Sequence, residues 1–185
     1  MRSARRRARW AAGVVAVAGL STTLSACIDQ EQAMPECEAD SRLAILAQAV
    51  PTASMVPCVK EMPAGWSFAA LDVESKRARF WLNSDRAGLR AVEVELTATC
   101  DIGGATRVPS EEEGSTRYRR VRSLSPKHSG VNYDVFDGGC VTYRYEFDKG
   151  LQIELLPEFN DAIALFPRGE LRQAVRRDLG HDLDP

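Results

Sequence analysis

The sequence predicts an α+β fold, in which one helix precedes an antiparallel sheet of about five strands and two helices follow it. Three observations predict this fold. Residues 91–99 alternate apolar and polar side chains, as a half-buried antiparallel strand does. Residues 38–50, 155–166 and 168–179 place apolar side chains three or four positions apart, as amphipathic helices do. An even set of four cysteines beyond residue 36 predicts two disulfides in an oxidising compartment.

The first helix is predicted over residues 38–50. Asp40 or Ser41 is suited to cap its start, and Pro51 ends it, because proline disfavours helical backbone in the residue before it. The apolar stripe of this helix contains Leu43, Leu46, Ala47 and Val50. Residues 51–63 contain three prolines and are predicted to form a loop with a short extended piece.

The five strands are predicted from apolar runs and alternation between turn signals. They cover residues 66–73, 77–82, 91–99, 131–136 and 141–147. The first three form a meander, and Asp137-Gly138-Gly139 is a hairpin signal between the last two. Residues 101–114 are predicted to be loop, and residues 115–124 form a candidate basic strand.

Two helices are predicted at the carboxy terminus. The first covers residues 155–166, with Pro157 near its start, and Pro167 breaks it. The second covers residues 168–179, and Gly180 stands where a C-terminal cap residue belongs. The apolar positions that predict the first of these helices are Leu156, Phe159, Ile163 and Phe166.

Four cysteines, Cys37, Cys58, Cys100 and Cys140, allow three disulfide connectivities. We favour Cys37–Cys58, which closes a local helix-and-loop unit, and Cys100–Cys140, which joins the ends of neighbouring strands. Metal binding is the poorer interpretation, because no C-x-x-C pair occurs and the two histidines are isolated. No cofactor is predicted.

The amino terminus has the three parts of a secretory signal. Residues 1–9 carry five arginines and no acid, residues 10–20 are apolar, and residues 21–26 are small and polar. A permanent membrane span is the weaker interpretation, because such a helix needs about 20 apolar residues. Arg5-Arg6-Arg7 suggests export by the twin-arginine route as an alternative. Ala8 and Arg9 follow where that signal usually has a hydrophobic pair, so we favour the general secretory route.

The end of this segment, Leu24-Ser25-Ala26-Cys27, resembles the lipobox of bacterial lipoproteins. The resemblance covers the first 27 residues and implies that the thiol of Cys27 receives a diacylglyceryl group before the signal peptide is cut. The alternative is an ordinary secretory signal, with Cys27 as a disulfide partner. The expected organisation is a signal peptide over residues 1–26, a tether over residues 27–36 and one α+β domain over residues 37–185.

The body of the chain is similar to uncharacterised secreted proteins of high-GC actinobacteria, from about Cys37 to the carboxy terminus. This resemblance implies an extracytoplasmic location and no particular activity. The segments that carry it are Val50-Pro51-Thr52-Ala53, Val56-Pro57-Cys58, Pro63-Ala64-Gly65-Trp66 and Phe80-Trp81-Leu82-Asn83-Ser84-Asp85-Arg86.

The net charge expected after removal of the signal peptide limits the classes of partner that this protein can bind. All 26 acids lie beyond residue 26 but only 19 of the 24 basic residues do, which leaves a net charge of −7. An acidic chain argues against nucleic acid as the main ligand. The lipid must therefore attach the protein to the outer face of the cytoplasmic membrane, and two acyl chains are needed because one binds only marginally.

The rival to a binding function is a secreted hydrolase that uses His128. Ser125 and Ser129 flank this histidine and Asp134 follows, but no G-x-S-x-G turn presents a nucleophile. We therefore expect His128 to be a loop histidine, and the catalytic set to be empty. Asp134 and Asp137 beside Gly138 are explained by a hairpin turn, and the acidic run 111–113 lacks the spacing of a calcium loop.

Two sets of residues are candidates for ligand contact. Trp66, Trp81, Tyr143 and Tyr145 lie in predicted strands, where aromatic rings line ligand sites but more often pack in the core. The arginines Arg117, Arg119, Arg120 and Arg122 could bind an anionic wall polymer, although a solvated edge strand explains them as well. The sequence thus favours a lipid-anchored, non-catalytic domain that binds an envelope protein or a cell-wall polymer.

Overall fold

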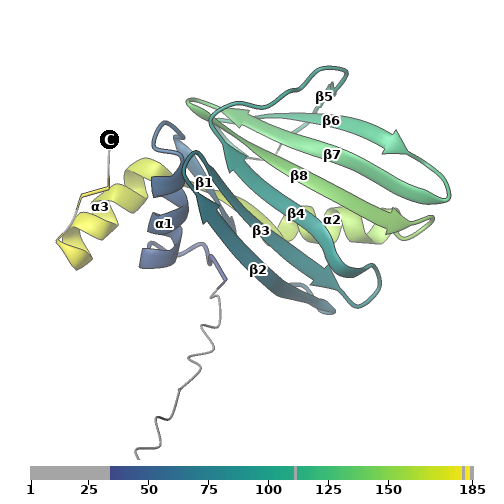
Figure 1. Cartoon of the computed structure of the whole chain (residues 1–185), viewed down its shortest axis with the longest axis horizontal. Coiled ribbons are helices and arrows are strands. Elements are labelled where there is room, and N and C mark those ends of the chain that lie inside the picture. The colour runs from purple at the N-terminus through teal and green to yellow at the C-terminus, as the bar shows by residue number, and fades with distance from the viewer. Residues whose placement is uncertain (1–33, 111, 181, 184–185) are drawn as a thin grey trace, which may run out of the picture. The chain divides into compact units, whose positions relative to one another are not determined.

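The computed structural model describes residues 34–110, 112–180 and 182–183, and within them the chain forms three helices and nine strands (Figure 1). The helices are α1 (Ser41–Ala49), α2 (Gln152–Ala162) and α3 (Arg168–Leu179). The strands are β1 (Met55–Val59), β2 (Trp66–Glu74), β3 (Arg77–Ser84), β4 (Gly88–Thr97), β5 (Thr106–Val108), β6 (Thr116–Ser123), β7 (Lys127–Phe136), β8 (Gly139–Asp148) and β9 (Ile163–Pro167). Cys27 and the predicted signal segment lie outside the described residues.

Seven of these strands form one antiparallel sheet in the order β2-β3-β4-β8-β7-β6-β5, and β1 and β9 pair as a second sheet. The α+β class is therefore confirmed, but the prediction of about five strands is too low. β5 has only three residues, too few to show alternation. The four arginines of β6 conceal its alternation, so it could be offered only as a candidate strand.

The predicted meander is confirmed as β2-β3-β4, and the predicted hairpin as β7 and β8 joined at Asp137 and Gly138. β7 begins earlier than expected, because Lys127 already pairs with Asp148. His128 is therefore a buried strand residue rather than a loop residue. The assignment of Asp134 to a turn is also wrong, since it lies within β7 and is fully buried.

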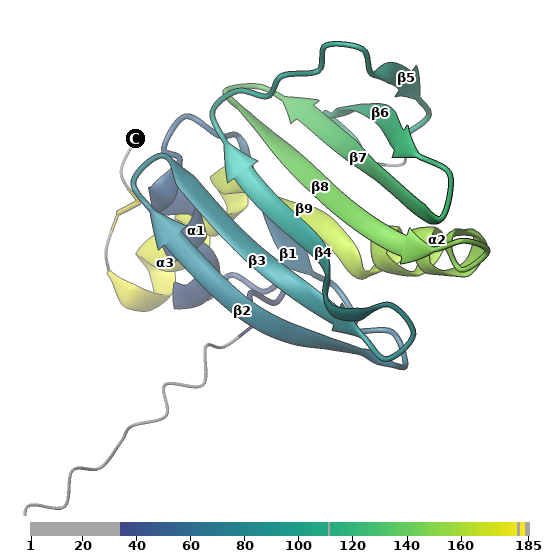
Figure 2. The ribbon, with the colours of Figure 1, turned by 45° about the vertical axis from the view of Figure 1, so that its right-hand side comes forward.

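The three helices and the β1–β9 pair lie on one face of the large sheet, here called the helix face (Figure 2). The main core fills the space between these layers and contains Leu46, Phe80, Leu96, Phe147 and Phe159. Burying an apolar side chain of this size stabilises the fold by roughly 1.5 to 3 kcal/mol each.

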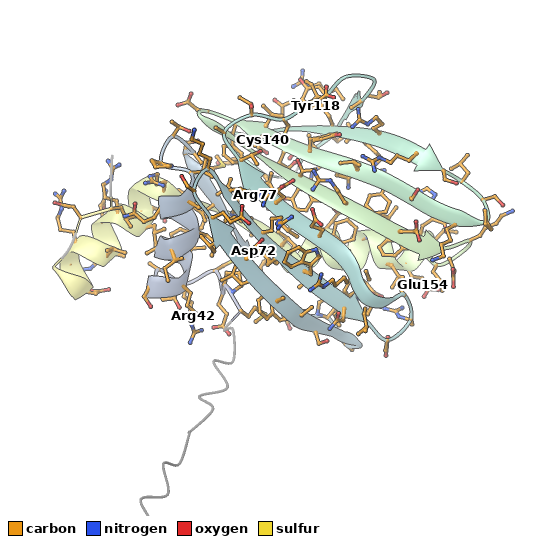
Figure 3. The ribbon with its side chains drawn as sticks, viewed as in Figure 1. Arg42, Asp72, Arg77, Tyr118, Cys140 and Glu154 are labelled. Carbon is orange, nitrogen blue, oxygen red and sulfur yellow. A yellow bond between two sulfur atoms is a disulfide. The ribbon has the colours of Figure 1, made fainter. Side chains whose placement is uncertain are left out.

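The opposite face of the sheet, here called the open face, is turned toward the viewer in Figure 3. Near Tyr118 and Cys140 it carries a second, smaller apolar cluster built on Val131 and Tyr133. Ile102 and Ala105, from the segment between β4 and β5, pack on this cluster. The disulfide Cys100–Cys140 ties that segment to β8, with its Cα atoms 5.9 Å apart.

The second disulfide joins Cys37, before α1, to Cys58 in β1, with Cα atoms 4.9 Å apart. The structure thus has the two bonds that the sequence favoured. Asp40 caps α1 by accepting from the backbone N–H groups of Arg42 and Leu43, and Gly180 ends α3 in the left-handed conformation, as predicted.

The helix predicted over residues 155–166 is only partly correct. α2 begins three residues earlier, at Gln152, and ends at Ala162. Ile163 and Phe166 satisfy the helical spacing but belong to β9, where Phe166 pairs with Val56. Tertiary pairing with β1 overrides the local period here, because apolar residues three apart also fit a short strand with one buried side and one half-buried side.

None of the described helices has both the length and the apolar character needed to cross a membrane.

Candidate functional site

A groove of about 480 Å³ lies on the helix face, between α2 and β6. One wall is a single face of α2, since its residues recur at intervals of four, which places them above one another on a helix. These residues are Gln152, Ile153, Leu156, Pro157, Asn160 and Asp161. The other wall consists of Arg117 and Arg119 in β6 with Pro109 and Glu112 in the loop before it. We call this recess the α2–β6 groove.

Arg117 is held in place by a carboxylate beneath the groove. Its Nε and Nη2 each donate to an oxygen of Asp134 at 2.7 Å, in the bidentate geometry that suits a guanidinium. The antiparallel register sets this pair, because Arg117 lies directly opposite Asp134. The hydroxyl of Tyr143 in β8 donates to the same carboxylate at 2.9 Å. A buried anion thus has three charged or polar donors.

The charges in this cluster support one another. The hydrogen bond from Arg117 to Asp134 raises the pKa of Arg117, although its desolvation acts in the opposite direction. Burial raises the pKa of Tyr143 well above its usual value, and the negative charge of Asp134 adds to this effect. At neutral pH Arg117 is therefore charged and Tyr143 is a neutral donor, so the cluster is a fixed base for the groove.

Arg119 differs from Arg117 because its partner is neutral. Its Nε donates to Oδ1 of Asn132 at 3.1 Å, and Asn132 is fully buried. Within the described residues, the Nη1 and Nη2 groups of Arg119 have no hydrogen-bond partner, and neither does Nδ2 of Asn132. The groove wall therefore presents a guanidinium whose charge is not neutralised by a carboxylate bonded to it.

Two acidic side chains and one exposed apolar side chain also line the groove. Glu112 lies close enough to raise the pKa of Arg117, as a smaller contribution than Asp134. Asp161 stands near the carboxyl end of α2. Ile153 is 75% exposed, which is unusual for a large apolar residue. Cationic, anionic and apolar groups thus meet in one recess.

The four aromatic residues predicted to contact a ligand are not brought together. Trp66, Tyr143 and Tyr145 are buried on the helix face. Tyr145 packs on Phe159 of α2, with ring centroids 5.8 Å apart, so these tyrosines lie behind the α2–β6 groove rather than in it. Trp81 is half-buried and lies on the open face, in the same row as Glu93 and Arg144.

Trp81 borders a separate recess of about 450 Å³ on the open face. Two guanidiniums cover its ring, with Arg79 at 5.2 Å and Arg90 at 4.8 Å from the centroid. Its Nε1 donates to Glu93 at 3.0 Å. Arg144 bridges Glu93 and Glu95 beside it. The Trp81 indole N–H, the two glutamates and Arg144 thus already have partners in the chain.

Trp66 is tied to α2 by a polar contact that depends on pH. Its Nε1 donates to Glu158 at 2.7 Å, and Arg86 donates to the same oxygen. Partial burial opposes ionisation of Glu158, but the bonds from Trp66 and Arg86 outweigh it, so the pKa of Glu158 is lowered. Glu158→Gln should therefore lower the free energy of unfolding at neutral pH by less than about 1 kcal/mol.

The stability difference between the wild-type protein and Glu158→Gln should shrink as the pH falls from the unfolded pKa of glutamate, and it should vanish below the lowered folded-state pKa of Glu158, because protonation then removes the charge from both states. Urea unfolding at pH 7 and pH 3 checks this expectation. A difference at pH 3 that is as large as the difference at pH 7, or larger, would contradict it.

The four arginines of β6 are divided by the alternation of the strand. Arg117 and Arg119 line the α2–β6 groove, whereas Arg120 lies on the open face and Arg122 lines the recess of that face beside Trp81. Arg120 is engaged by Tyr133 and by the carbonyl oxygen of Gly103. The cluster in the sequence is therefore not one patch on the molecule.

His128 is not arranged as a general base. It is buried and stacks on Tyr145, with ring centroids 5.9 Å apart. Ser129 points to the open face, since adjacent strand residues alternate, and Asp134 is bonded to Arg117. Within the described part of the chain, no serine hydroxyl or carboxylate bonds to His128, so the arrangement that a serine hydrolase uses is not assembled.

The described residues also contain no group of three or more His, Cys, Asp and Glu side chains placed to hold a metal ion.

The role of Asn132 and Asp134 was missed at the sequence level, although a signal for it exists. In β7 the helix face receives His128, Gly130, Asn132 and Asp134, while Val131, Tyr133 and Val135 face the other way. A strand whose polar side is turned toward the covered face indicates a buried polar cluster, but the sequence does not say which side is covered.

No known protein family matches this chain, and neither a curated protein nor a solved structure similar to it was found.

Proposed function

We propose that this protein is an envelope lipoprotein, held by a diacylglyceryl group on Cys27 at the outer face of the cytoplasmic membrane. Its folded part is a non-catalytic binding domain, and the α2–β6 groove is its binding site. The observation that carries this proposal is the guanidinium of Arg119 in the groove wall. Among the described residues its Nη groups lack partners, and the neutral Asn132 orients it.

Burial of polar groups without partners is costly, at roughly 1 to 3 kcal/mol for each group, unless water or a ligand satisfies them. Asn132 has such an amide nitrogen directly behind Arg119. In the neighbouring cluster, Asp134 accepts two bonds from Arg117 and one from Tyr143, and these bonds give this wall a fixed shape. A fixed wall with spare donors favours recognition of a ligand, because little ordering is needed on binding.

A photo-crosslinking experiment tests the groove in the full-length protein. A benzophenone amino acid replaces Ile153, which is 75% exposed in the groove, and in a second variant it replaces Leu89, which is 86% exposed and not part of the groove. After irradiation of intact cells, intact-mass analysis should show a discrete adduct at position 153 only. The adduct should disappear when Arg119→Gln is added.

Equal labelling at positions 153 and 89, or no adduct at position 153, would remove the groove from the proposal. An adduct that survives Arg119→Gln would show that this guanidinium does not hold the ligand.

A further inference from the structure

We propose that the α2–β6 groove binds a short peptide by its free carboxyl terminus, with Arg119 as the group that receives the carboxylate. This inference rests on the proposed binding function and adds the chemical class of the ligand. Four features of the groove support it, and they concern its cation, its acids, its apolar wall and its backbone.

The first feature is the guanidinium of Arg119, which is the cation of the groove that has bonds to spare. A guanidinium with Nε already bonded to Asn132 has lost part of its rotational freedom, and it keeps Nη1 and Nη2 for a ligand. A carboxylate is planar and takes two parallel N–H bonds from such a group. Arg117 is unsuited to this role because it is only 13% exposed and is already paired with Asp134. Arg119 is thus the residue that we assign to the peptide carboxylate.

The acids limit the ligand to one such anion. Glu112 and Asp161 line the same groove, and the mature chain has a net charge of −7. A polyanion would be repelled by these charges, since like charges in contact disfavour binding. A peptide with free ends instead offers a cation as well. Asp161 is the acid that we assign to its ammonium group, because the carboxyl end of α2 adds negative dipole there.

The wall provided by α2 suits the rest of a peptide. Ile153, Leu156 and Pro157 form an apolar strip for a side chain, and Gln152 and Asn160 lie on the same helix face with amide groups. Pro157 has no N–H, so the carbonyl of Ile153 lacks the donor that an α-helix normally provides four residues later. That carbonyl is an acceptor for a peptide N–H. A volume of about 480 Å³ lies within the range of small-ligand pockets.

Equilibrium dialysis tests the inference with the full-length lipidated protein in detergent micelles. The probes are a tripeptide library with free ends, the same library amidated at the carboxyl terminus, and the same library acetylated at the amino terminus. Mass spectrometry measures which peptides the protein retains. Free-ended peptides should be retained, and amidation should reduce retention at least tenfold, because it removes the charge that Arg119 receives.

Arg119→Gln should reduce retention of the free-ended library at least tenfold, whereas Arg122→Gln should leave it unchanged. Arg122 is a matched control, since it lies in the same strand but on the open face. Arg119→Lys should give retention between that of the wild-type protein and that of Arg119→Gln, because lysine keeps the positive charge but lacks the two parallel N–H donors of a guanidinium. Asp161→Asn should weaken retention several-fold for free-ended peptides and not for acetylated ones. Thermal unfolding of each variant separates loss of binding from loss of fold.

Three outcomes would overturn the inference. One is equal retention of amidated and free-acid peptides. Another is an equal effect of Arg119→Gln and Arg122→Gln. The third is that no peptide of the free-ended library is retained. If any of these occurs while the adduct at position 153 still forms, the groove remains a binding site with another ligand. If that adduct is also absent, the proposed function fails as well.

Discussion

Replacing Asp134 with asparagine should lower the free energy of unfolding by about 3 to 5 kcal/mol. The substitution keeps the size of the side chain but removes a fully buried charge that neutralises Arg117. The guanidinium, 13% exposed, would then be left in the interior without a counter-charge, and Tyr143 would lose a charged acceptor. Removing one partner of a buried pair costs far more than the pair itself contributes. Urea unfolding monitored by circular dichroism measures the change.

Two control variants identify the cause. Glu146→Gln breaks the exposed pair with Lys127, whose side chains are 59% and 54% exposed, and should change stability far less than Asp134→Asn does, because solvent screens this pair. Arg117→Met combined with Asp134→Leu removes both buried charges and should recover most of the loss. A cost for Asp134→Asn as small as that for Glu146→Gln would contradict the buried cluster. A double variant no more stable than Asp134→Asn would show that repacking, not charge, is responsible.

The largest effect on location is expected for Cys27→Ala. We expect this variant to leave the membrane fraction, either as released protein or as uncut precursor. The acyl group is the attachment that the proposal assigns to the protein, and its mature charge of −7 opposes binding to anionic lipid. Metabolic labelling with an alkyne fatty acid and fractionation of the cells measure acylation and location in one experiment.

The matched control for this experiment removes two other cysteines. Cys37→Ala with Cys58→Ala breaks a disulfide and should lower stability by about 2 to 5 kcal/mol, yet acylation and membrane retention should remain. Normal labelling and retention of Cys27→Ala would defeat the anchor proposal. Equal loss of labelling in the control would show that the acyl group is not specific to Cys27.

Local pattern was sufficient to predict the elements that carry strong local signals. α1 has a capping aspartate and a following proline, and α3 has a proline before it and a glycine after it, so both were located within a few residues. The β2-β3-β4 meander follows from turns and alternation. The boundary between α2 and β9 could not be predicted, because pairing of Phe166 with Val56 depends on a strand about 100 residues earlier in the sequence.

The candidate site was predicted only in part. Arg117 and Arg119 were recognised as candidates within a cluster of four, but the division of that cluster depends on the register of β6 against β7. The aromatic set was chosen for ligand contact, yet three of its members pack in the core. The wall formed by α2 was not foreseen, since none of its residues has chemistry that stands out in a linear sequence.

The sequence by itself determined the order of most elements, the even set of four cysteines beyond residue 36 and the net charge of −7 over residues 27–185. Only the tertiary structure decided which side of β7 faces the helices. Alternation predicts that Asn132 and Asp134 share one side and Val131 and Tyr133 the other. The segment tied down by Cys100–Cys140 covers the apolar side, which leaves the polar side to face α2. That choice depends on contacts distant in sequence, and it places Arg119 in the groove.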